Sequence, residues 1–583
     1  MIFTSPSWVP DIPGEIPDTI TVGDFALQGN ASLPPQCGGK APFVDGITGK
    51  SYSTKTLLER VDWLSRSLAK EFGWSPNDGS PEDKVVAVYS WNTLDFFVTC
   101  WAVHRLNGIC LPVHPFSIVP EIVAHMTRSK CKIIFTCQSL VANTLSAAEE
   151  LSIPNEQIYT MALPEGYLPN PEPIDQFKSV EQLIAEGEKL DPTPSLTWEK
   201  GRAKTQVAYY CATSGTSGKQ KLAKITHYNF IANVLQASMF ESYAKSGRNE
   251  IAIGAIPFTH GYGLALGHIM VYRGDSLIVI PRFDMQLMLK LIPQYRIERL
   301  YLVRISWASK GPVLSNLAEQ VPPILAAFAA NPFLLNLFDI SSVQTIVTGA
   351  AALDRVLASK LHDLQPHWKF NHAYGLTETG VIATWTSSHD VWHGSSGSVL
   401  PQFGIRLVKP NGEDVEGLDE PGEVHFTSPS IFAGYLGDDE SNKNTFDDKG
   451  WLKSGDVGVF RKAPSGNEHL FILDRIKDMI KVKGDQVVPR DIESVLLSHP
   501  AIVDAAVIGV PDELSGERAK AYIVRSATEM ADMDEEDLAD HIDEYVQDRL
   551  HESHWLHDRI EFMAKLPKSE SGKVLKKDLR ALN

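Results

Sequence analysis

The sequence predicts an α/β protein with a large N-terminal domain and a small α+β domain at the C-terminal end. Three changes of pattern along the chain support this interpretation. From Lys84 onward, short apolar runs alternate with helical patterns, which is typical of βαβ units that form a parallel sheet with helices on both faces. Between Gly394 and Leu473, short strands are interrupted by Gly, Pro, Asp and Asn, which indicates a β-rich subdomain. Beyond Asp474 the chain becomes charged and continues through helix, strand, strand and acidic helix.

The length also favours more than one domain, because 583 residues exceed what one hydrophobic core holds. We expect residues 1–473 to form the large domain and 474–583 the small one. In the large domain, apolar runs predict strands at 85–89, 109–113, 132–136, 251–257, 276–280 and 300–303, and helical patterns predict helices at 94–106 and 121–129. In the small domain we expect a helix at 492–497, strands at 503–510 and 519–524, and an acidic helix at 534–550.

Composition and charge exclude several classes of protein. Apolar residues make up 43% and charged residues 22%, which are ordinary values for a globular protein. The net charge of -18 argues against nucleic acid as a partner, because binding the phosphate backbone needs a concentrated basic face. The six cysteines contain no CxxC pair, which favours reduced thiols in a cytosol-like compartment.

Targeting and membrane signals also point to a cytoplasmic protein. The first 13 residues carry no basic residue ahead of an apolar run, and the last three are not a peroxisomal SKL-type signal. The longest uncharged run, 251–272, contains Pro257, four glycines and two histidines. We therefore expect it to form a strand, an active-site loop and a buried helix, and expect no membrane span.

A hydroxyl- and glycine-rich segment at 210–221 directly follows the apolar run 207–211 and predicts a phosphate-binding loop. Glycines let backbone N–H groups approach an anion, hydroxyls add donors, and lysines supply positive charge. The segment is not a Walker A loop, because only two residues separate Gly215 from Gly218 and Lys219 is followed by Gln220. Taken alone, it could equally be an ordinary surface turn.

Five further segments follow this loop, at 348–353, 371–378, 451–457, 473–486 and 566–574. Together with the loop they closely resemble the adenylate-forming (AMP-binding) superfamily, which includes acyl-CoA synthetases, 4-coumarate:CoA ligases, firefly luciferases and nonribosomal adenylation domains. The resemblance covers roughly residues 40–580. The segments 256–264 and 321–325 are most similar to 4-coumarate:CoA ligases and related fungal acyl-CoA ligases.

The resemblance implies a fold and a reaction. The large domain would contain two αβ-layered subdomains and a distorted β-barrel, and the small α+β domain would be mobile. ATP would activate a carboxylic acid as an acyl-adenylate, and the thiol of coenzyme A would then displace AMP, with Mg²⁺ as the metal. We expect an aryl, phenylpropanoid or medium-chain acid.

The resemblance also assigns the nucleotide contacts. The loop would hold the β- and γ-phosphates, Thr377 the α-phosphate, Glu378 the Mg²⁺ ion, Tyr374 the adenine and Asp456 the ribose. The full expected set for ATP and AMP is Thr213, Ser214, Gly215, Thr216, Ser217, Gly218, Lys221, Ala350, Tyr374, Gly375, Thr377, Asp456, Arg475 and Lys573.

Lys573, in a Ser-Gly-Lys sequence, is the expected catalytic lysine, together with Thr377, Glu378 and His260. Its ammonium would act as a mobile point charge between the acid's oxygen and the α-phosphate. An isolated lysine of this kind would otherwise be a solvated surface residue. Lys477 matches the hinge position of the family, and the coenzyme A contacts would come from Lys481, Lys483 and Gly484, although the two lysines separately also fit a charged turn.

The acid pocket implied by the resemblance is lined by His260, Tyr262, Gly263, Leu266, Gly349, Ala373 and Val381. No acidic residue closely follows His260, which favours an acid without an α-amino group, and a lone histidine in an apolar run is also typical of a core residue. His372 and Ala373 stand where the family usually has Gln-Gly, and Gln220 and Leu222 replace a usual Pro and Gly. These departures affect the choice of acid rather than the reaction class.

Two alternative functions and one anomaly stay open. The acyl group could pass to the thiol of a carrier protein acting in trans, or the chain could be a non-catalytic nucleotide-binding relative, against which Lys573, Glu378 and Asp456 argue. The segment Arg304 to Val321 interrupts the usual passage from a strand into a helix. Our hypothesis is that these 18 residues are an unspliced intron carried into the gene model, and the alternative is a real lid loop beside the acid pocket.

Overall fold

The structure is a computed structural model. It describes residues 1–29, 40–168, 174–213, 220–245, 248–254, 256–303, 325, 328–329, 332–349, 355–483, 485–512, 514–527, 529–568 and 574–583. The predicted residues that lie outside this part of the chain are Ser214, Gly215, Thr216, Ser217, Gly218, 304–321, Ala350, Gly484 and Lys573.

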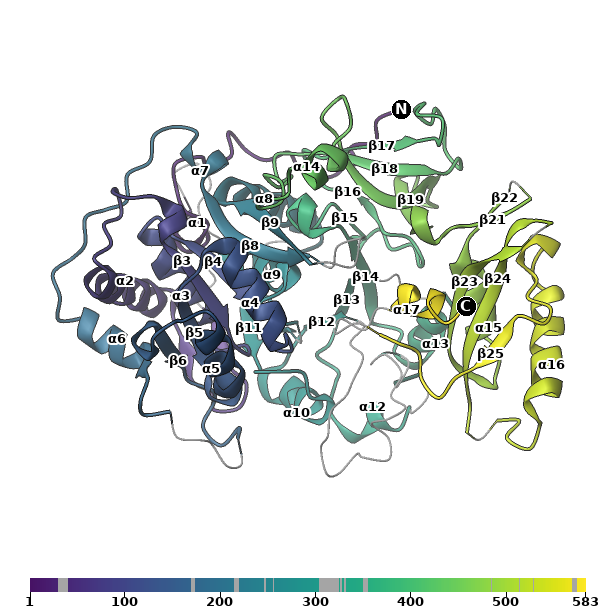
Figure 1. The fold of residues 1–583 in the computed structure, drawn as a ribbon, viewed down its shortest axis with the longest axis horizontal. Helices are drawn as coiled ribbons and strands as arrows, with labels where there is room; N and C mark the ends of the chain where they lie inside the picture. The colour runs from purple at the N-terminus through teal and green to yellow at the C-terminus, as the bar shows by residue number, and fades with distance from the viewer. Residues whose placement is uncertain are drawn as a thin grey trace.

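Two large, mostly parallel sheets form the N-terminal part of the molecule (Figure 1). The nine-stranded sheet has the order β16 (Ser398–Val399), β15 (Thr384–Trp385), β14 (Lys369–Tyr374), β13 (Thr345–Gly349), β12 (Arg299–Val303), β10 (Ile251–Gly254), β11 (Ser276–Val279), β1 (Phe43–Asp45) and β2 (Ser51–Tyr52). The seven-stranded sheet has the order β7 (Lys178–Ser179), β6 (Ile158–Met161), β5 (Ile133–Cys137), β3 (Val85–Tyr89), β4 (Ile109–Val113), β8 (Val207–Thr213) and β9 (Lys221–Thr226).

The two sheets share one hydrophobic core, because helices are packed between them. Apolar side chains of both sheets join in a single cluster with those of the inner helices α1 (Val22–Gln28), α3 (Asp95–Arg105), α8 (His227–Lys245) and α9 (Gly261–Tyr272). Separate clusters lie on the outer faces, where α10 (Met285–Tyr295) and α13 (Arg355–Leu364) cover the nine-stranded sheet and α4 (Val119–Ser129) and α5 (Val141–Glu150) cover the seven-stranded one. This arrangement confirms the expected pair of αβ-layered subdomains.

A four-stranded antiparallel sheet, which corresponds to the β-rich part predicted from 394 onward, follows the nine-stranded sheet along the chain. Its order is β17 (Gly404–Val408), β18 (Gly422–Thr427), β19 (Leu452–Lys462) and β20 (Glu468–Arg475). The beginning of the chain reaches this sheet: Phe3 forms a β-bridge with Ile405, and its ring stacks on Phe460 with the centroids 3.8 Å apart.

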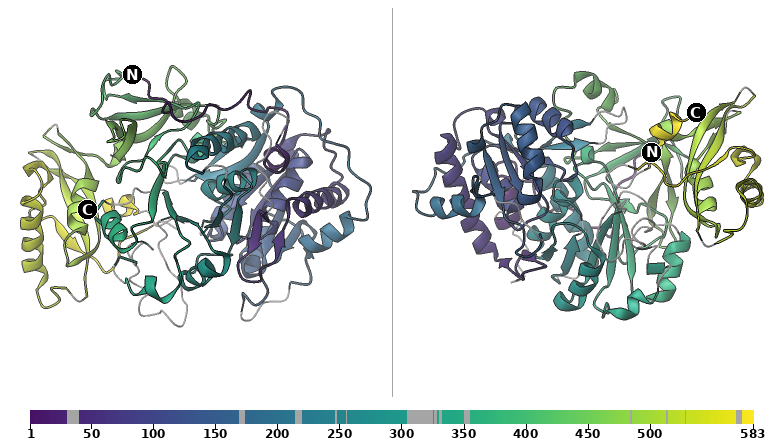
Figure 2. Two further views of the ribbon diagram at one scale, coloured as in Figure 1. Left: turned by 180° about the vertical axis from the view of Figure 1, so that it is seen from behind. Right: turned by 60° about the horizontal axis from the view of Figure 1, so that its bottom comes forward.

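The C-terminal unit has a sheet and a core of its own. Its strands are β21 (Ile480–Val482), β22 (Asp485–Val487), β23 (Ile502–Asp512), β24 (Gly516–Arg525) and β25 (Ile560–Phe562). The helices α15 (Pro489–Leu497) and α16 (Glu535–Gln547) share one hydrophobic cluster with this sheet, whereas Leu579 of α17 (Lys576–Arg580) belongs to another. Figure 2 shows the unit, drawn in yellow-green, on the opposite side of the molecule from the N-terminal helices and strands.

The predicted elements are present with ends that move by a few residues. The run 251–272 is β10, a turn and the buried helix α9, and among the described residues no helix is long and apolar enough to span a membrane. β10 ends at Gly254, before Pro257, which has no N–H to donate to a ladder. β8 extends to Thr213 because it pairs with β9, a strand that the sequence analysis missed.

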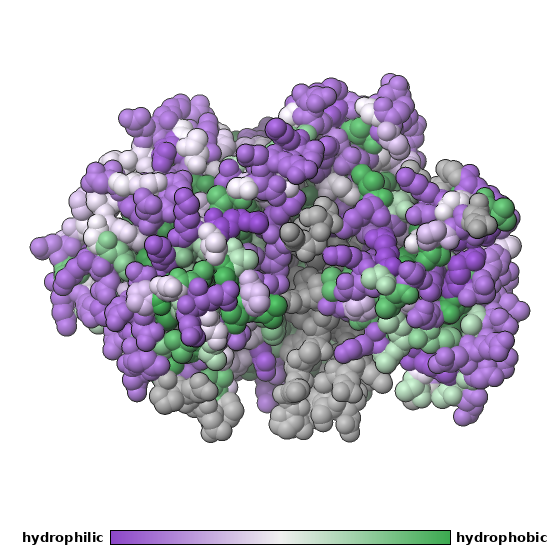
Figure 3. All heavy atoms as spheres, in the orientation of Figure 1, coloured by the Kyte–Doolittle hydropathy of each residue, from purple (hydrophilic) through white to green (hydrophobic). Residues whose placement is uncertain are grey.

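Hydrophilic side chains cover most of the face seen in Figure 3, and hydrophobic ones gather only in small groups. The five cysteines in the described part of the chain are free and buried, while Cys37 lies outside it. These five thiols therefore form no disulfides with one another.

Candidate active site

The candidate site lies where three parallel strands of the nine-stranded sheet end. Gly349, the last residue of β13, pairs with Val303 of β12 on one side and with Ala373 of β14 on the other. The turn between β10 and α9 follows the neighbouring strand and carries His260. Ligands of open α/β sheets bind outside the carboxyl ends of such strands.

Close packing brings four predicted residues together at these strand ends, with Gly261 between two of them. A Cβ atom added to Gly349 would lie 3.1 Å from the ring of Tyr262, so this backbone lies directly against the ring. A Cβ on Gly261 would lie 3.4 Å from Cγ2 of Val381 and 3.6 Å from Oγ1 of Thr377. The predicted acid pocket and the predicted α-phosphate contact are therefore neighbours.

Glycine is required at position 263, in the first turn of α9. A Cβ there would lie 2.1 Å from the carbonyl oxygen of Pro257, a distance that no side chain tolerates. Leu266, one turn further along, is 2% exposed and belongs to the core between the sheets. The hydroxyl of Tyr262 is buried and has no hydrogen-bond partner among the residues that the structure describes.

His260 caps the N-terminus of α9, because its Nδ1 accepts a hydrogen bond of 3.2 Å from the backbone N–H of Tyr262. The side chain of His260 keeps contact with solvent, but many protein atoms surround it. These surroundings desolvate the imidazole and, together with the neighbouring His114, lower the pKa of His260 to about 4. The imidazole is therefore neutral near pH 7, so the positive charge that offsets the carboxylate of an acid has to come from other groups.

The predicted phosphate loop is the connection of the β8–β9 hairpin, in which Thr213 pairs with Lys221. The ammonium of Lys221 lies 4.9 Å from the ring centroid of Tyr435. Arg128, on α4, donates a hydrogen bond of 3.4 Å to the carbonyl of Gln220. Two cationic side chains thus flank the described ends of this connection, which suits an anionic ligand.

Glu378, the predicted metal residue, lies with Thr377 on the short helix η4 (Thr377–Thr379). Its Oε1 accepts a hydrogen bond of 2.6 Å from the hydroxyl of Tyr435. Burial and the carboxylate of Glu378 raise the pKa of Tyr435, so its hydroxyl is a donor at neutral pH. A carboxylate oxygen is the kind of ligand that Mg²⁺ prefers.

Asp456, Tyr374 and Arg475 form a second cluster. Asp456 and Arg475 are paired residues of β19 and β20, and their side chains form an ion pair with 3.4 Å between Nε and Oδ1. The Tyr374 hydroxyl donates a hydrogen bond of 2.8 Å to Oδ2 of Asp456. Burial and Asp456 raise the pKa of Tyr374 well above its usual range, so the hydroxyl stays protonated. Gly375 follows directly, where a Cβ would meet the carbonyl of Val381 at 2.0 Å.

The remaining predicted residues lie on the C-terminal unit. Lys477 is in the short helix η5 (Ile476–Asp478), and Arg580 of α17 donates a hydrogen bond of 3.3 Å to its carbonyl. Lys481 and Lys483 are exposed on and next to β21, and their backbone N–H groups bond to Glu517 and Ser515 of the same unit. The structure does not bring these two lysines to the strand ends.

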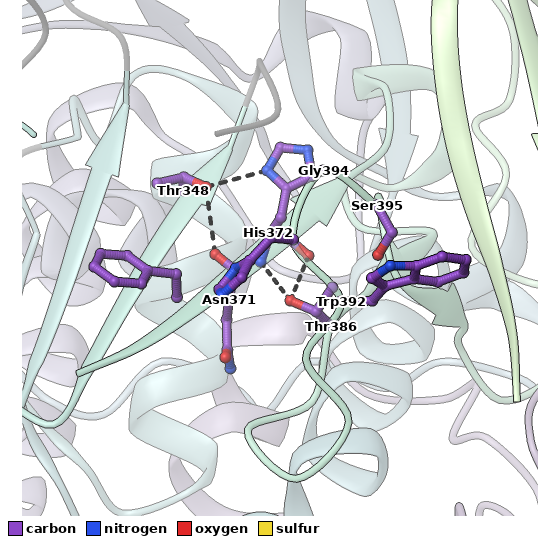
Figure 4. A pocket seen from close by; sticks show the side chains of 9 residues that line it. Thr348, Asn371, His372, Thr386, Trp392, Gly394 and Ser395 are labelled. Atoms are coloured by element: carbon purple, nitrogen blue, oxygen red, sulfur yellow. Dashed lines mark hydrogen bonds between the residues drawn. The ribbon is translucent and has the colours of Figure 1, made fainter. Parts of the chain in front are cut away.

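A small pocket lies alongside β14 and is lined by polar and aromatic side chains (Figure 4). In the figure Thr348 and the ring of His372 face each other, with 3.1 Å between Oγ1 of Thr348 and Nδ1 of His372. Trp392 lies on the side of His372 away from Thr348. Burial and the nearby Arg490 lower the pKa of His372 to about 4. The histidine that replaces the usual glutamine of the family is therefore neutral and hydrogen-bonded here.

The sequence analysis missed Tyr435 and Arg128. Tyr435 lies in an apolar segment, 431–437, that contains two glycines and precedes an acidic stretch. That pattern could have indicated a short extended segment against the sheet. Arg128 lies in the last turn of an ordinary amphipathic helix, and nothing in its surroundings in the sequence distinguishes it from a solvated arginine.

Comparisons with known proteins agree along the whole chain. The family model "AMP-binding enzyme" matches residues 35–436, and "AMP-binding enzyme C-terminal domain" matches 491–573. The acyl-CoA ligase easD of Emericella nidulans is 76% identical over 583 residues, covering all of both chains. The acyl-CoA ligase cm3C of Cordyceps militaris is 51% identical, covering 100% of this chain and 90% of its own.

Solved structures show the same fold at lower identity. The anthranilate CoA ligase AuaEII in complex with anthranoyl-AMP is similar with a TM-score of 0.77 and 19% identity, covering 97% of this chain and 98% of that one. ATP-bound MatB from Rhodopseudomonas palustris is similar with a TM-score of 0.74 and 23% identity, covering 97% and 99%.

Proposed function

The chain belongs to the AMP-binding enzyme family and is an ATP-dependent acid–thiol ligase, and we propose that its acid is an aryl, phenylpropanoid or medium-chain carboxylic acid without an α-amino group. Its substrates are the acid, ATP and coenzyme A, with Mg²⁺ as the metal. The observation that carries the proposal is the packing of Tyr262, Gly349, Thr377 and Val381 beside Ala373 at the strand ends. The apolar side chains there would form one wall of the acid pocket, next to Thr377, the residue that we expect at the α-phosphate.

In the first half-reaction, a carboxylate oxygen attacks the α-phosphorus, a P–O bond forms, and the bond to pyrophosphate breaks. Both reactants are anions, so cations and hydrogen-bond donors around the phosphate lower the barrier. We assign Thr377 to the α-phosphate, Thr213 and Lys221 with their connecting loop to the β- and γ-phosphates, and Lys573 to the charge that develops during attack.

Glu378 would hold the metal, which supplies positive charge to the phosphates. Among the described residues no group of three histidine, cysteine or carboxylate side chains could hold a metal ion by itself. This fits Mg²⁺, which proteins usually bind through one or two carboxylates together with substrate phosphates.

In the second half-reaction, the thiolate of coenzyme A attacks the acyl carbon and AMP leaves. We propose that the chain rotates at Lys477, between a domain of residues 1–473 and one of 474–583, so that Lys481, Lys483 and Gly484 approach the adenylate. The position of Lys481 and Lys483 away from the strand ends supports this assignment, because these residues need such a movement to take part.

A pyrophosphate-release assay over a panel of aromatic, phenylpropanoid and C6–C12 acids tests the proposal, with coenzyme A present or absent and acyl-CoA identified by mass spectrometry. We expect pyrophosphate release with at least one class of acid and thioester only with coenzyme A. Release without thioester would instead favour a carrier-protein thiol as the acceptor. Failure of every acid in the panel would contradict the proposed class of acid.

The variant Lys573→Ala tests the catalytic assignment in the same assay. We expect it to abolish adenylation but to largely spare thioester formation from supplied acyl-adenylate, because the charge is needed only while the α-phosphate is attacked. Lys577→Ala, which changes an exposed lysine of α17, is the matched control and should leave both halves unchanged. Equal loss of both half-reactions in Lys573→Ala would contradict the assignment.

A further inference from the structure

Tyr435 connects two parts of the candidate site, Lys221 and Glu378, that are far apart in the sequence. Its hydroxyl donates a hydrogen bond of 2.6 Å to Oε1 of Glu378. In the same segment, the backbone N–H of Phe432 donates a hydrogen bond of 2.9 Å to the carbonyl of Glu378. Both the backbone and the carboxylate of Glu378 are therefore held by residues 432–435.

The segment is itself held by the seven-stranded sheet. Gly434 accepts a hydrogen bond of 2.9 Å from Lys224, and Leu436 donates one of 2.8 Å to Leu222, so the segment pairs with β9. Asn442, on α14 (Asp439–Thr445), bonds to both backbone groups of Tyr435: its Oδ1 accepts at 2.6 Å from the N–H and its Nδ2 donates at 3.0 Å to the carbonyl. The contacts with β9, the strand that follows the phosphate loop, and with Asn442 therefore fix the backbone that carries the Tyr435 hydroxyl.

The ring of Tyr435 also contacts Lys221, at the described end of the loop, since the ammonium of Lys221 lies 4.9 Å from the ring centroid. One side chain therefore contacts the loop lysine through its ring and the metal carboxylate through its hydroxyl. A hydrogen bond to one carboxylate oxygen fixes the orientation of the group and directs the other oxygen. In metal sites generally, mutating a residue that orients a metal ligand weakens metal binding about 10- to 100-fold.

We propose that Tyr435 is a positioning residue that orients the Glu378 carboxylate toward the divalent cation of the bound nucleotide. This inference rests on the proposed function, which assigns the metal to Glu378. Tyr435 contacts the metal only through Glu378. The alternative is a tyrosine that only packs against β9, and it predicts no effect of the hydroxyl on metal affinity.

The variant Tyr435→Phe removes the hydroxyl and keeps the ring under Lys221. The measurement is the affinity for Mn²⁺, by electron paramagnetic resonance, of the full-length enzyme saturated with α,β-methylene-ATP. We expect the dissociation constant for Mn²⁺ to rise about 10-fold, while the analogue binds without metal as it does to the wild type. Adenylation should need a correspondingly higher Mg²⁺ concentration, and thioester formation from supplied acyl-adenylate should be unchanged.

Tyr228→Phe is the matched control, since its ring also faces a lysine, Lys204, with 5.0 Å between the ammonium and the centroid. It should leave the Mn²⁺ affinity unchanged. A double-mutant cycle with Glu378→Gln separates positioning from packing, because Tyr435→Phe should have no further effect on Mn²⁺ affinity once the carboxylate is gone.

An unchanged Mn²⁺ affinity in folded Tyr435→Phe, or an equal effect in the Glu378→Gln background, would overturn the inference. If the wild type releases pyrophosphate with an acid but the variant binds Mn²⁺ normally, only the positioning role fails. If the wild type neither binds Mn²⁺ with the nucleotide nor releases pyrophosphate, the proposed function fails instead.

Discussion

At the scale of single residues, two buried leucines of α9 provide a test of the predicted acid pocket, because only Leu266 is predicted to line it. Leu266 is 2% exposed and Leu264 is fully buried, and both belong to the core between the sheets. Either leucine-to-alanine change should destabilise the fold by about 2–5 kcal/mol. We expect Leu266→Ala alone to shift the preference toward bulkier acids without changing the KM for ATP, because it opens the acid pocket.

Pyrophosphate release over a series of acids of increasing bulk measures this shift, with Leu264→Ala as the control for lost stability. An unchanged acid profile in Leu266→Ala would exclude this residue from the pocket. The same result in both variants would point to a general loosening of α9.

The residues of the candidate site differ in how visible they are in the sequence. Asp456 and Tyr374 stand in ordered motifs, and the structure joins them by a hydrogen bond. Tyr435 has no such motif, and its partner Glu378 is 57 residues away. Its role depends on pairing with β9, which is a tertiary contact that local sequence does not specify.

At the scale of elements, the short helix η5 connects β20 to the C-terminal unit and carries Lys477. We expect Lys477→Pro to leave adenylation nearly intact and to cripple thioester formation. Proline fixes φ near -65°, which matches a 3₁₀ turn but prevents a rotation at this residue. Lys477→Ala, which keeps φ free, should retain both half-reactions.

Rapid-mixing assays that follow acyl-adenylate and thioester separately provide the measurement. The hinge assignment is wrong if acyl-adenylate fails to accumulate in Lys477→Pro, or if thioester forms at the rate of the wild type.

The elements that the sequence predicts well are those with a strong local pattern. The strands at 85–89 and 109–113 have the predicted ends, because continuous apolar runs suit strands buried on both faces. β9 escapes prediction because Lys221 and Lys224 interrupt its apolar residues, and its pairing with β8 decides its conformation. Local pattern also does not show which strands lie side by side, so it predicts the parallel sheets but not their order.

At the scale of the whole molecule, four buried histidines make stability depend on pH. Burial lowers the pKa of His104 to about 3 and those of His268 and His372 to about 4, and it lowers the pKa of His227 well below the usual value. In the unfolded chain each pKa is about 6.5. The unfolded state therefore binds more protons below this pH, and stability decreases as the pH falls from about 6.5 toward 4.

Each of these histidines contributes a slope of at most about 1.4 kcal/mol per pH unit in this range. Urea unfolding of the intact protein at pH 7.5, 6.0 and 5.0 measures the change. We expect a clear loss of unfolding free energy between pH 6.0 and 5.0. A constant value would show that these histidines are protonated in the folded protein.

The segment Arg304 to Val321 lies outside the described residues, and the intron hypothesis for it stays a prediction. Its 18 residues correspond to a coding length that preserves the reading frame. Sequencing the transcript is the direct test, and an mRNA that retains these codons rejects the hypothesis. If they are absent from it, protein made without the segment should be the more soluble and more active form.

The shared core between the two large sheets determines where this chain can be recombined with relatives. A chimera with a crossover between α3 and α8 would take these two helices from different parents. Because both helices pack in the same core, side chains from one parent would then have to pack against side chains from the other. Apolar side chains of the C-terminal sheet pack against the helices α15 and α16 of the same unit. A C-terminal unit taken from a relative would therefore keep its own core. Only the surface by which it contacts the rest of the molecule would have to match the new parent.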